Sequence, residues 1–404
     1  MVKTIWVINQ FAGKQDSGWG ERHYYFARYW VKKGYDVNII SGSFNHLFKV
    51  QPQVSNKTFT TETIEKNITF CWVKIAKYNP ESVFKLWSMM VFAFKILFLS
   101  KKVLNKPDVV LISSMPIFSV LPAYLLAKKY KAKFLFEVRD LWPQTPIHLK
   151  GYKKWHPIIL LMASFEKLGY RKAEYIISVL PNSSNYINKI SKKPEKWVYI
   201  PNGIDKNMVG NESVDVEIKN QIPPDKFVIG YAGTIGLANA MDDFIQASIL
   251  LKNNDKIHFV MVGDGYKKED YIKKTLGNNN ITYIPKIDKA KVQDLLKLFN
   301  VCYVGRFDSP LYKHGVSYNK YFDYMLAKKP ILESSSFIKD PVELSGCGLI
   351  VKPESAEAIV DGINELYNME YVGIDKLGNV GYNYVIKHHN FKFLSDKYTQ
   401  LFES

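Results

Sequence analysis

The segment 309–332 holds the densest set of side chains that could handle a charged ligand. In it, Ser317 and Asn319 precede an amphipathic run that predicts a helix, and either side chain could cap that helix. A helix N-terminus presents backbone N–H groups and the positive end of a dipole, and Lys320 adds a cation there. Asp323 lies one helical turn beyond Asn319, where a carboxylate could accept hydrogen bonds from ribose hydroxyls. We therefore predict a pyrophosphate site in this segment; the alternative is that Asp323 is a solvated acid on a helix surface.

Three glycine-containing loops follow predicted strands. GYAGTIG (230–236) delivers three glycines into a loop before a helix, which favours phosphate or sugar contact, although a tight turn for packing has the same composition. VGDG (262–265) is by itself a turn signature, and its interest comes from its position after a strand. The loop from Gly13 to Gly20 also brings backbone close to a ligand, but it lacks the GxGxxG spacing of a dinucleotide site, and an ordinary surface loop is the alternative.

A charged cluster emerges at the end of another predicted strand. In FEVRDLWPQTP (136–146) the strand breaks at Pro143, and Glu137, Arg139 and Asp140 come at its carboxyl end. Ligands of parallel sheets bind outside the carboxyl ends of the strands, so the cluster is a candidate for chemistry. A structural ion pair is the alternative.

These loops need a scaffold of parallel strands, and the sequence predicts two. Val- and Ile-rich runs alternate with helix signals in both halves, as in strands buried on both faces of a sheet. We therefore expect two doubly wound α/β domains. Residues 1–205 form the first, residues 206–385 form the second, and residues 386–404 form a terminal helix that packs back on the first.

The charge of the chain is uneven. Its 404 residues carry a formal net charge of +17, but residues 1–200 hold 31 basic and 12 acidic side chains and the remainder holds 24 and 26. A basic first half suggests an anionic partner such as nucleic acid, a membrane surface or a phosphorylated substrate. The sequence shows no helix-turn-helix, RRM, KH or zinc-finger signature, so we predict no nucleic-acid binding.

The cysteines and the apolar segments bear on the compartment. Cys71, Cys302 and Cys347 are far apart and form no CxxC pair, so we predict no disulfide framework or structural zinc and expect a reducing cytoplasm. The N-terminus runs directly into a short strand pattern and lacks the features of a signal peptide. The most apolar stretch, 86–99, is shorter than the ~20 residues of a spanning helix, so we expect a buried or membrane-touching helix.

Taken in order, these motifs resemble the GT-B glycosyltransferases, and more closely the retaining glycosyltransferase family 4. The resemblance covers nearly the whole chain and rests on the first glycine loop, PDVVLISS, VRDLWP, IPNGID, GYAGTIG, VGDG and GVSYNKYFDYMLAKKPIL. It is closest to the bacterial N-acetyl-L-fucosamine transferases of surface polysaccharide assembly, which share the VRDLWP and NK-x-FDYM wording. Two departures stand out: the family's E-x7-E pair falls on Gly315 and Asp323, and the family's phosphate-binding Lys is missing near Ala238 and Asn239.

The resemblance implies an α/β fold of the GT-B type, with two Rossmann-like domains facing across a cleft. It implies a retaining enzyme that moves a sugar, N-acetyl-L-fucosamine or another N-acetylamino sugar, from a nucleotide-sugar, most simply a UDP-sugar. The acceptor would be a lipid-linked saccharide in O-antigen or capsule biosynthesis. No metal or other cofactor is implied. The alternatives are a GT-B-shaped sugar-nucleotide epimerase and a non-catalytic glycosyltransferase subunit.

The resemblance also assigns residues. The candidate catalytic residues are Asp140, Arg139 and Lys320. The candidate acceptor-binding residues are Trp19, Arg22, Glu137 and Trp142. The candidate nucleotide-sugar-binding residues are Gly18, Gly20, Gly233, Thr234, Gly263, Pro285, Lys286, Ile287, Arg306, Gly315, Val316, Ser317, Asn319, Lys320 and Asp323.

One group of clustered lysines suggests a membrane surface as a partner. Lys150, Lys153 and Lys154 lie beside Trp142 and Trp155 and are followed by the apolar run PIILLMASF. Lysines flanked by tryptophan and apolar residues suit an anionic membrane surface, although solubilising lysines are the alternative. We therefore expect a cytoplasmic protein that is peripheral on the inner face of the bacterial inner membrane.

Overall fold

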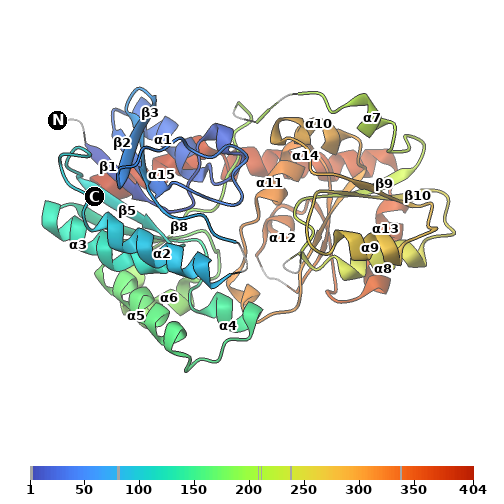
Figure 1. The fold of residues 1–404 in the computed structure, drawn as a ribbon. Coiled ribbons are helices and arrows are strands. Elements are labelled where there is room, and N and C mark those ends of the chain that lie inside the picture. The colour runs from blue at the N-terminus through green and yellow to red at the C-terminus, as the bar shows by residue number, and fades with distance from the viewer. Residues whose placement is uncertain (1–2, 80–81, 208, 211, 237–238, 337–338) are drawn as a thin grey trace. The chain divides into compact units, whose positions relative to one another are not determined.

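The computed structural model describes residues 3–79, 82–207, 209–210, 212–236, 239–336 and 339–404 (Figure 1). The chain divides into two compact units, each built on its own sheet. Unit 1 runs to Asn202 and takes in Phe391–Ser404, and unit 2 is Gly203–Asn390.

Unit 1 is an eight-stranded sheet in the order β3-β4-β2-β1-β5-β6-β7-β8. Its strands are β1 Thr4–Ile8, β2 Asp36–Gly42, β3 Phe59–Glu65, β4 Ile68–Val73, β5 Val109–Ser113, β6 Lys133–Val138, β7 Tyr175–Ser178 and β8 Trp197–Tyr199. All neighbours pair in parallel except β3, which is antiparallel to β4. The carboxyl ends of the central strands therefore meet at one edge of the sheet.

Helices cover both faces of the unit 1 sheet (Figure 1). They are α1 Arg22–Lys32, α2 Val83–Ile96, α3 Val120–Tyr130, α4 Gln144–Lys150, α5 Pro157–Lys172, α6 Ser184–Ser191 and α15 Phe391–Glu403. Helices α1 and α15 pack together on one face, where an aromatic cluster includes Phe26, Trp30, Tyr398 and Phe402. Helices α2, α3 and α5 pack on the other face.

Unit 2 is a parallel six-stranded sheet in the order β11-β10-β9-β12-β13-β14. Its strands are β9 Phe227–Ala232, β10 Ile257–Val262, β11 Ile281–Ile284, β12 Val301–Gly305, β13 Ile331–Ser334 and β14 Gly348–Val351. Its helices are α7 Val216–Lys219, α8 Asp242–Leu250, α9 Lys268–Lys274, α10 Val292–Lys297, α11 Asn319–Leu326, α12 Pro341–Ser345, α13 Ala356–Asn368 and α14 Tyr371–His388. Helices α8 and α13 pack on one face, and α11 packs against α14.

The two predicted doubly wound α/β domains are confirmed, with three local differences. The antiparallel β3–β4 hairpin was not expected. The apolar stretch 86–99, expected as a helix, lies in a helix only as far as Ile96, because the chain then enters a series of turns. Helix α14 was also not expected, since its glycines argue against a helix. Two of them are needed for packing: a Cβ at Gly378 would lie 2.0 Å from the Lys328 carbonyl oxygen, and one at Gly381 would lie 2.9 Å from the Cys347 Cβ.

Candidate active site

Two glycine loops meet at the carboxyl edge of the unit 2 sheet. The Gly233 N–H, just after β9, donates to the carbonyl of Val262 at the end of β10. Gly263 has φ +140°, and a Cβ there would lie 1.9 Å from the carbonyl oxygen of Gly233. The loops are thus in direct backbone contact, and the packing role that the sequence left open for these glycines is real.

Lys320 reaches this edge from the first turn of α11. Its ammonium Nζ donates to the phenolic oxygen of Tyr231 at 3.1 Å and to the side-chain oxygen of Asn239. It lies 4.5 Å from the centre of the Tyr231 ring, and a Cβ at Gly233 would lie 3.6 Å from it. No carboxylate among the described residues forms an ion pair with Lys320. The structure therefore brings Lys320 and Gly233 together, as a phosphate site requires.

Burial and the charge of Arg306 lower the pKa of Lys320 to about 7. Its two hydrogen-bond partners are neutral, so they do not offset the cost of removing the ammonium from water. A dianionic ligand at this position would supply the missing negative charge.

Helix α11 begins at Asn319, and its N-cap residue is Tyr318 in an extended conformation. The side chain of Tyr318 makes no cap hydrogen bond, and the expectation that Ser317 or Asn319 is the N-cap residue is wrong. Asn319 is exposed, and Ser317 and Asp323 are half-buried. The N-terminus of α11 carries the positive end of the helix dipole, which favours an anion.

Gly315 and Val316 are buried just before α11. Gly315 has φ +85°, a backbone conformation that side chains rarely adopt. A glutamate at this position would be strained, which explains why the departure from the family pattern is a glycine.

Arg306 lies at the end of β12 and is 1% exposed. Its Nη2 donates to Tyr321 and to Glu333, and it lies 3.4 Å from Asp340 Oδ2. The guanidinium charge is therefore balanced by two buried carboxylates within the unit. Arg306 and Lys320 are both cations at this edge, but only Lys320 has no carboxylate beside it among the described side chains.

The segment after β11 carries the residues expected near the nucleobase. Pro285 and Lys286 are exposed and Ile287 is half-buried. Lys268 anchors this region, because its Nζ donates to the carbonyls of Gly263 at 2.8 Å and Ile284 at 3.3 Å. The sequence analysis missed Lys268; its spacing four residues after Asp264, with which it forms an ion pair, is the signal that could have found it.

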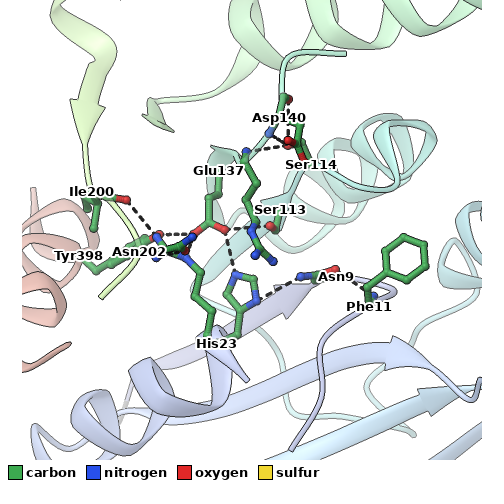
Figure 2. Close-up of polar contacts among 12 residues, drawn as sticks. Asn9, Phe11, His23, Ser113, Ser114, Glu137, Asp140, Ile200, Asn202 and Tyr398 are labelled. Atoms are coloured by element: carbon green, nitrogen blue, oxygen red, sulfur yellow. Dashed lines mark hydrogen bonds and ion pairs between the residues drawn. The ribbon is translucent and has the colours of Figure 1, made fainter. Parts of the chain in front are cut away.

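The centre of polar contacts in unit 1 is Glu137 (Figure 2). It lies at the end of β6 with 0% exposure. Its Oε1 accepts from His23 Nε2 at 3.1 Å and Ser113 Oγ at 2.8 Å, and its Oε2 accepts from Arg22 Nε at 3.3 Å and from the Tyr398 hydroxyl. Burial alone would raise the pKa of Glu137, but the charges of Arg22 and His23 hold that pKa well below its usual range.

The side chain of Arg22 connects this network to residues 200–202, where the first chain segment of unit 1 ends. Its Nη1 donates to the Pro201 carbonyl at 2.7 Å and to Asn202 Oδ1 at 3.0 Å, and its Nη2 donates to the Ile200 carbonyl at 3.0 Å. His23 Nδ1 lies 3.3 Å from the Asn9 amide, which fixes its ring from the other side. The structure thus brings Arg22 and Glu137 together, but inside the unit and not at its surface.

Arg139 and Asp140 continue the chain beyond β6 to the edge. The Arg139 N–H donates to Ser114 Oγ at 2.8 Å, and the Asp140 N–H lies 3.5 Å from the same oxygen (Figure 2). The Asp140 side chain is exposed, Arg139 is half-buried, and Trp142 is half-buried before α4. Ser114 thus holds this turn, and it was not predicted.

The first glycine loop closes on itself, since the Gly13 N–H donates to the Gly20 carbonyl at 3.1 Å, and its tip is exposed. Gly18 and Gly20 both have positive φ, 65° and 79°, and Trp19 between them is 47% exposed. Thr234 of unit 2 is also exposed. The sequence analysis missed His23, Ser113, Tyr398, Tyr231 and Glu333. Ser113 and Tyr231 lie within the quoted PDVVLISS and GYAGTIG but were not singled out, and the other three lie in ordinary helix or strand patterns.

The part of the chain that the structure describes contains neither a metal site nor a membrane-spanning helix. No group of three or more His, Cys, Asp or Glu side chains among them could hold a metal ion. No helix that the structure describes combines the length and apolarity needed to cross a membrane.

Comparison with known proteins identifies both units. The family model described as Glycosyltransferase Family 4 matches residues 18–207, and the one described as Glycosyl transferases group 1 matches residues 226–369. The colanic acid biosynthesis glycosyl transferase WcaI of Escherichia coli (strain K12) is 24% identical over 280 residues. That match spans 64% of this chain and 66% of WcaI, slightly under two thirds of its length.

Solved structures share the fold over the whole chain. Sucrose-phosphate synthase from Thermosynechococcus elongatus matches with a TM-score of 0.74 and 14% identity, covering 99% of this chain and 98% of that chain. HepE of Anabaena in complex with UDP and glucose matches with a TM-score of 0.68 and 12% identity, covering 99% of both chains. These matches and the two parallel sheets confirm the predicted GT-B fold.

Proposed function

Since a Family 4 glycosyltransferase model and a group 1 glycosyl transferase model match successive parts of this chain and its fold is GT-B, we propose that it moves a sugar from a UDP-sugar to a lipid-linked saccharide. The sugar is N-acetyl-L-fucosamine or another N-acetylamino sugar, and the product belongs to O-antigen or capsule assembly. Two similarities support this: HepE was solved with UDP and glucose, and WcaI is named for colanic acid biosynthesis. The protein acts from the cytoplasm, peripheral on the inner membrane.

The observation that carries the proposal is the setting of Lys320. It is a half-buried cation beside Gly233, in the first turn of α11, with two neutral partners. A nucleoside diphosphate is the ligand whose charge completes this arrangement. The ribose then lies along α11 toward Asp323, and the base lies at residues 285–287.

The proposed reaction depends on stabilising the leaving diphosphate. The bond from the sugar's anomeric carbon to the diphosphate oxygen breaks, and negative charge develops on the diphosphate. Lys320 and the α11 dipole stabilise this charge as it forms, and we propose no metal or other cofactor in that role. The acceptor hydroxyl attacks from the face that the diphosphate leaves, and its proton passes to the departing diphosphate, which retains the anomeric configuration.

Unit 1 is the proposed acceptor side. Asp140, exposed after β6, and the neighbouring Arg139 are our candidates for orienting the acceptor hydroxyl. The exposed Trp19 ring offers an apolar face for a saccharide. Glu137 and Arg22 are positioning residues that hold the end of β6 from inside.

A transfer assay tests the proposal. The protein is incubated with a panel of nucleotide-sugars and a lipid-linked oligosaccharide extract, and sugar incorporation into the lipid fraction is measured. We expect transfer from a UDP-N-acetylamino sugar that requires both substrates. Conversion of a nucleotide-sugar without acceptor, followed by NMR, identifies an epimerase instead. Lack of transfer from every donor, with no donor raising the melting temperature, overturns the proposal.

A further inference from the structure

Helix α2 of unit 1 exposes an apolar stripe. Val83, Phe84, Trp87 and Phe94 of α2, and Phe98 in the turn just beyond it, are each 60% to 78% exposed. Their spacing follows one side of the helix, while the opposite side, including Met89, Phe92 and Ile96, is buried against unit 1. An exposed row of large apolar side chains on one helix indicates an interaction surface.

The stripe continues onto α3 and α5. Leu121 and Leu125 of α3 and Leu160 and Leu161 of α5 are 36% to 57% exposed. A groove of about 180 Å³ joins the three helices, and its lining is apolar throughout. Met90 and Phe94 line it from α2, Leu121 from α3, and Leu161 and Phe165 from α5. We call this continuous surface the α2–α3–α5 face.

The charges around the face have one sign. Residues 82–104, 117–133 and 141–165, which contain α2, α3 and most of α5, hold eleven lysines and neither Asp nor Glu. Eight of these lysines are exposed, and all lie near the ends of the helices or in the segments beside them: Lys101, Lys102, Lys128, Lys129, Lys131, Lys150, Lys153 and Lys154. At one border Lys153 lies 5.2 Å from the centre of the Trp155 ring, which is 68% exposed. Lysine and tryptophan together are typical of the membrane–water interface.

This charge pattern discriminates between possible occupants. A second copy in a two-fold contact would bring lysines against lysines, which is unfavourable. A bilayer with anionic headgroups attracts the lysines and takes up the apolar side chains. The 14 residues of α2 span roughly 21 Å, less than the roughly 30 Å of a hydrocarbon core, so the helix suits a position along the surface.

We propose that the α2–α3–α5 face docks on an anionic lipid bilayer, with the α2 stripe at the acyl-chain boundary and the bordering lysines over the headgroups. This deepens the proposed function by naming the surface that brings unit 1 to a lipid-linked acceptor. The docking itself requires no sugar and is therefore testable separately.

Vesicle flotation tests the proposal with the full chain. The vesicles are phosphatidylcholine alone and phosphatidylcholine with phosphatidylglycerol. We expect the protein to float with the anionic vesicles, less so at high salt, and weakly with the neutral ones. The variant Phe84→Ser/Trp87→Ser/Phe94→Ser removes the stripe and lowers the affinity by about 100-fold.

A matched control carries Leu276→Ser/Tyr371→Ser/Val372→Ser, which changes apolar side chains that are 76% to 86% exposed in unit 2. It should float like the unchanged protein. A second variant, Lys150→Glu/Lys153→Glu/Lys154→Glu, keeps the stripe and should lose the preference for anionic vesicles. UDP binding and melting temperature confirm that each variant is folded and separate this test from that of the proposed function.

Three outcomes overturn the proposal. One is the absence of flotation by the unchanged protein, and another is equal flotation by the stripe variant and its control. The third is a dimer in analytical ultracentrifugation that the stripe variant abolishes, since the face would then belong to a second copy.

Discussion

Each unit places a charged side chain at the carboxyl edge of its sheet, but the two charges have opposite settings. Glu137 of unit 1 is fully buried and accepts hydrogen bonds from four side chains, two of them basic. Lys320 of unit 2 is half-buried and has two neutral partners. Both lie where a parallel-sheet protein binds ligands, so position alone does not separate structure from chemistry.

The surroundings of Glu137 and Lys320 indicate which of the two side chains can bind a charged ligand. A buried carboxylate with a complete set of donors gains nothing from a further partner, whereas a desolvated cation without a carboxylate gains from any anion. We therefore assign Glu137 to the stability of unit 1 and Lys320 to donor binding. Substitutions at Glu137 should therefore affect stability, and substitutions at Lys320 should affect transfer.

Glu137→Ala should cost unit 1 about 3–5 kcal/mol, because the substitution leaves Arg22 and His23 buried without their carboxylate. Chemical denaturation measures the loss. Glu195→Ala, at an exposed position in the same unit, should change the free energy of unfolding by less than about 0.5 kcal/mol. Equal stability of the two variants contradicts the structural role of Glu137.

Lys320→Ala should lower sugar transfer by about 10²–10³-fold, because it removes a donor aimed at charge that develops in the transition state. The melting temperature should stay near that of the unchanged protein, since Lys320 belongs to no ion pair within the described part of unit 2. Lys376→Ala removes an exposed lysine of α14 and serves as the control. Full activity of Lys320→Ala would show that another group stabilises the diphosphate.

Tyr398→Phe should cost about 1–3 kcal/mol, because the lost hydroxyl leaves Glu137 short of one donor in a buried network. The substitution also tests how α15 is held to unit 1, since Tyr398 is its link to both Glu137 and Arg22. Denaturation of Tyr152→Phe, a change at a 41% exposed tyrosine, gives the baseline. If Tyr398→Phe loses no more free energy of unfolding than Tyr152→Phe, the Tyr398 hydroxyl does not stabilise the network.

Donor affinity should fall as the pH rises above about 7. The Lys320 ammonium, whose pKa is lowered by burial and by Arg306, is protonated below that value and loses its proton above it. Bound diphosphate raises the pKa again, so binding takes up a proton on the alkaline side. Calorimetric titration of a nucleotide-sugar across pH 6–9 measures the effect, which should be at most about tenfold per pH unit. Lys320→Arg should flatten the profile, and an unchanged slope in that variant assigns the proton to another group.

Part of this comparison could be predicted from the sequence. Strand-to-loop positions placed Gly233, Gly263, Lys320 and Asp140 at sheet edges, because buried runs of Val and Ile mark parallel strands. The sequence could not assign Glu137 to the interior. Its donors come from α1, β5 and α15, which are far apart along the chain, so the alternative of a structural ion pair stayed open beside a functional role.

The other contacts that the sequence did not predict also depend on backbone geometry and on packing in the folded chain. The cap of α11 depends on backbone geometry at Tyr318, which composition does not reveal. The phenol of Tyr231 and the amide of Asn239 become partners of Lys320 only when β9 and α11 pack together. The ion pairs of Arg306 with Glu333 and Asp340 likewise form only in the folded unit, since Glu333 lies on β13 and Asp340 is the N-cap residue of α12.

A crystal structure of the full chain with a nucleoside diphosphate tests the central claim most directly. We expect a phosphate oxygen within hydrogen-bond distance of Lys320 Nζ and of the first backbone N–H groups of α11, with Arg306 still paired to Glu333. A diphosphate bound elsewhere, with Lys320 still on Tyr231 and Asn239, would contradict it.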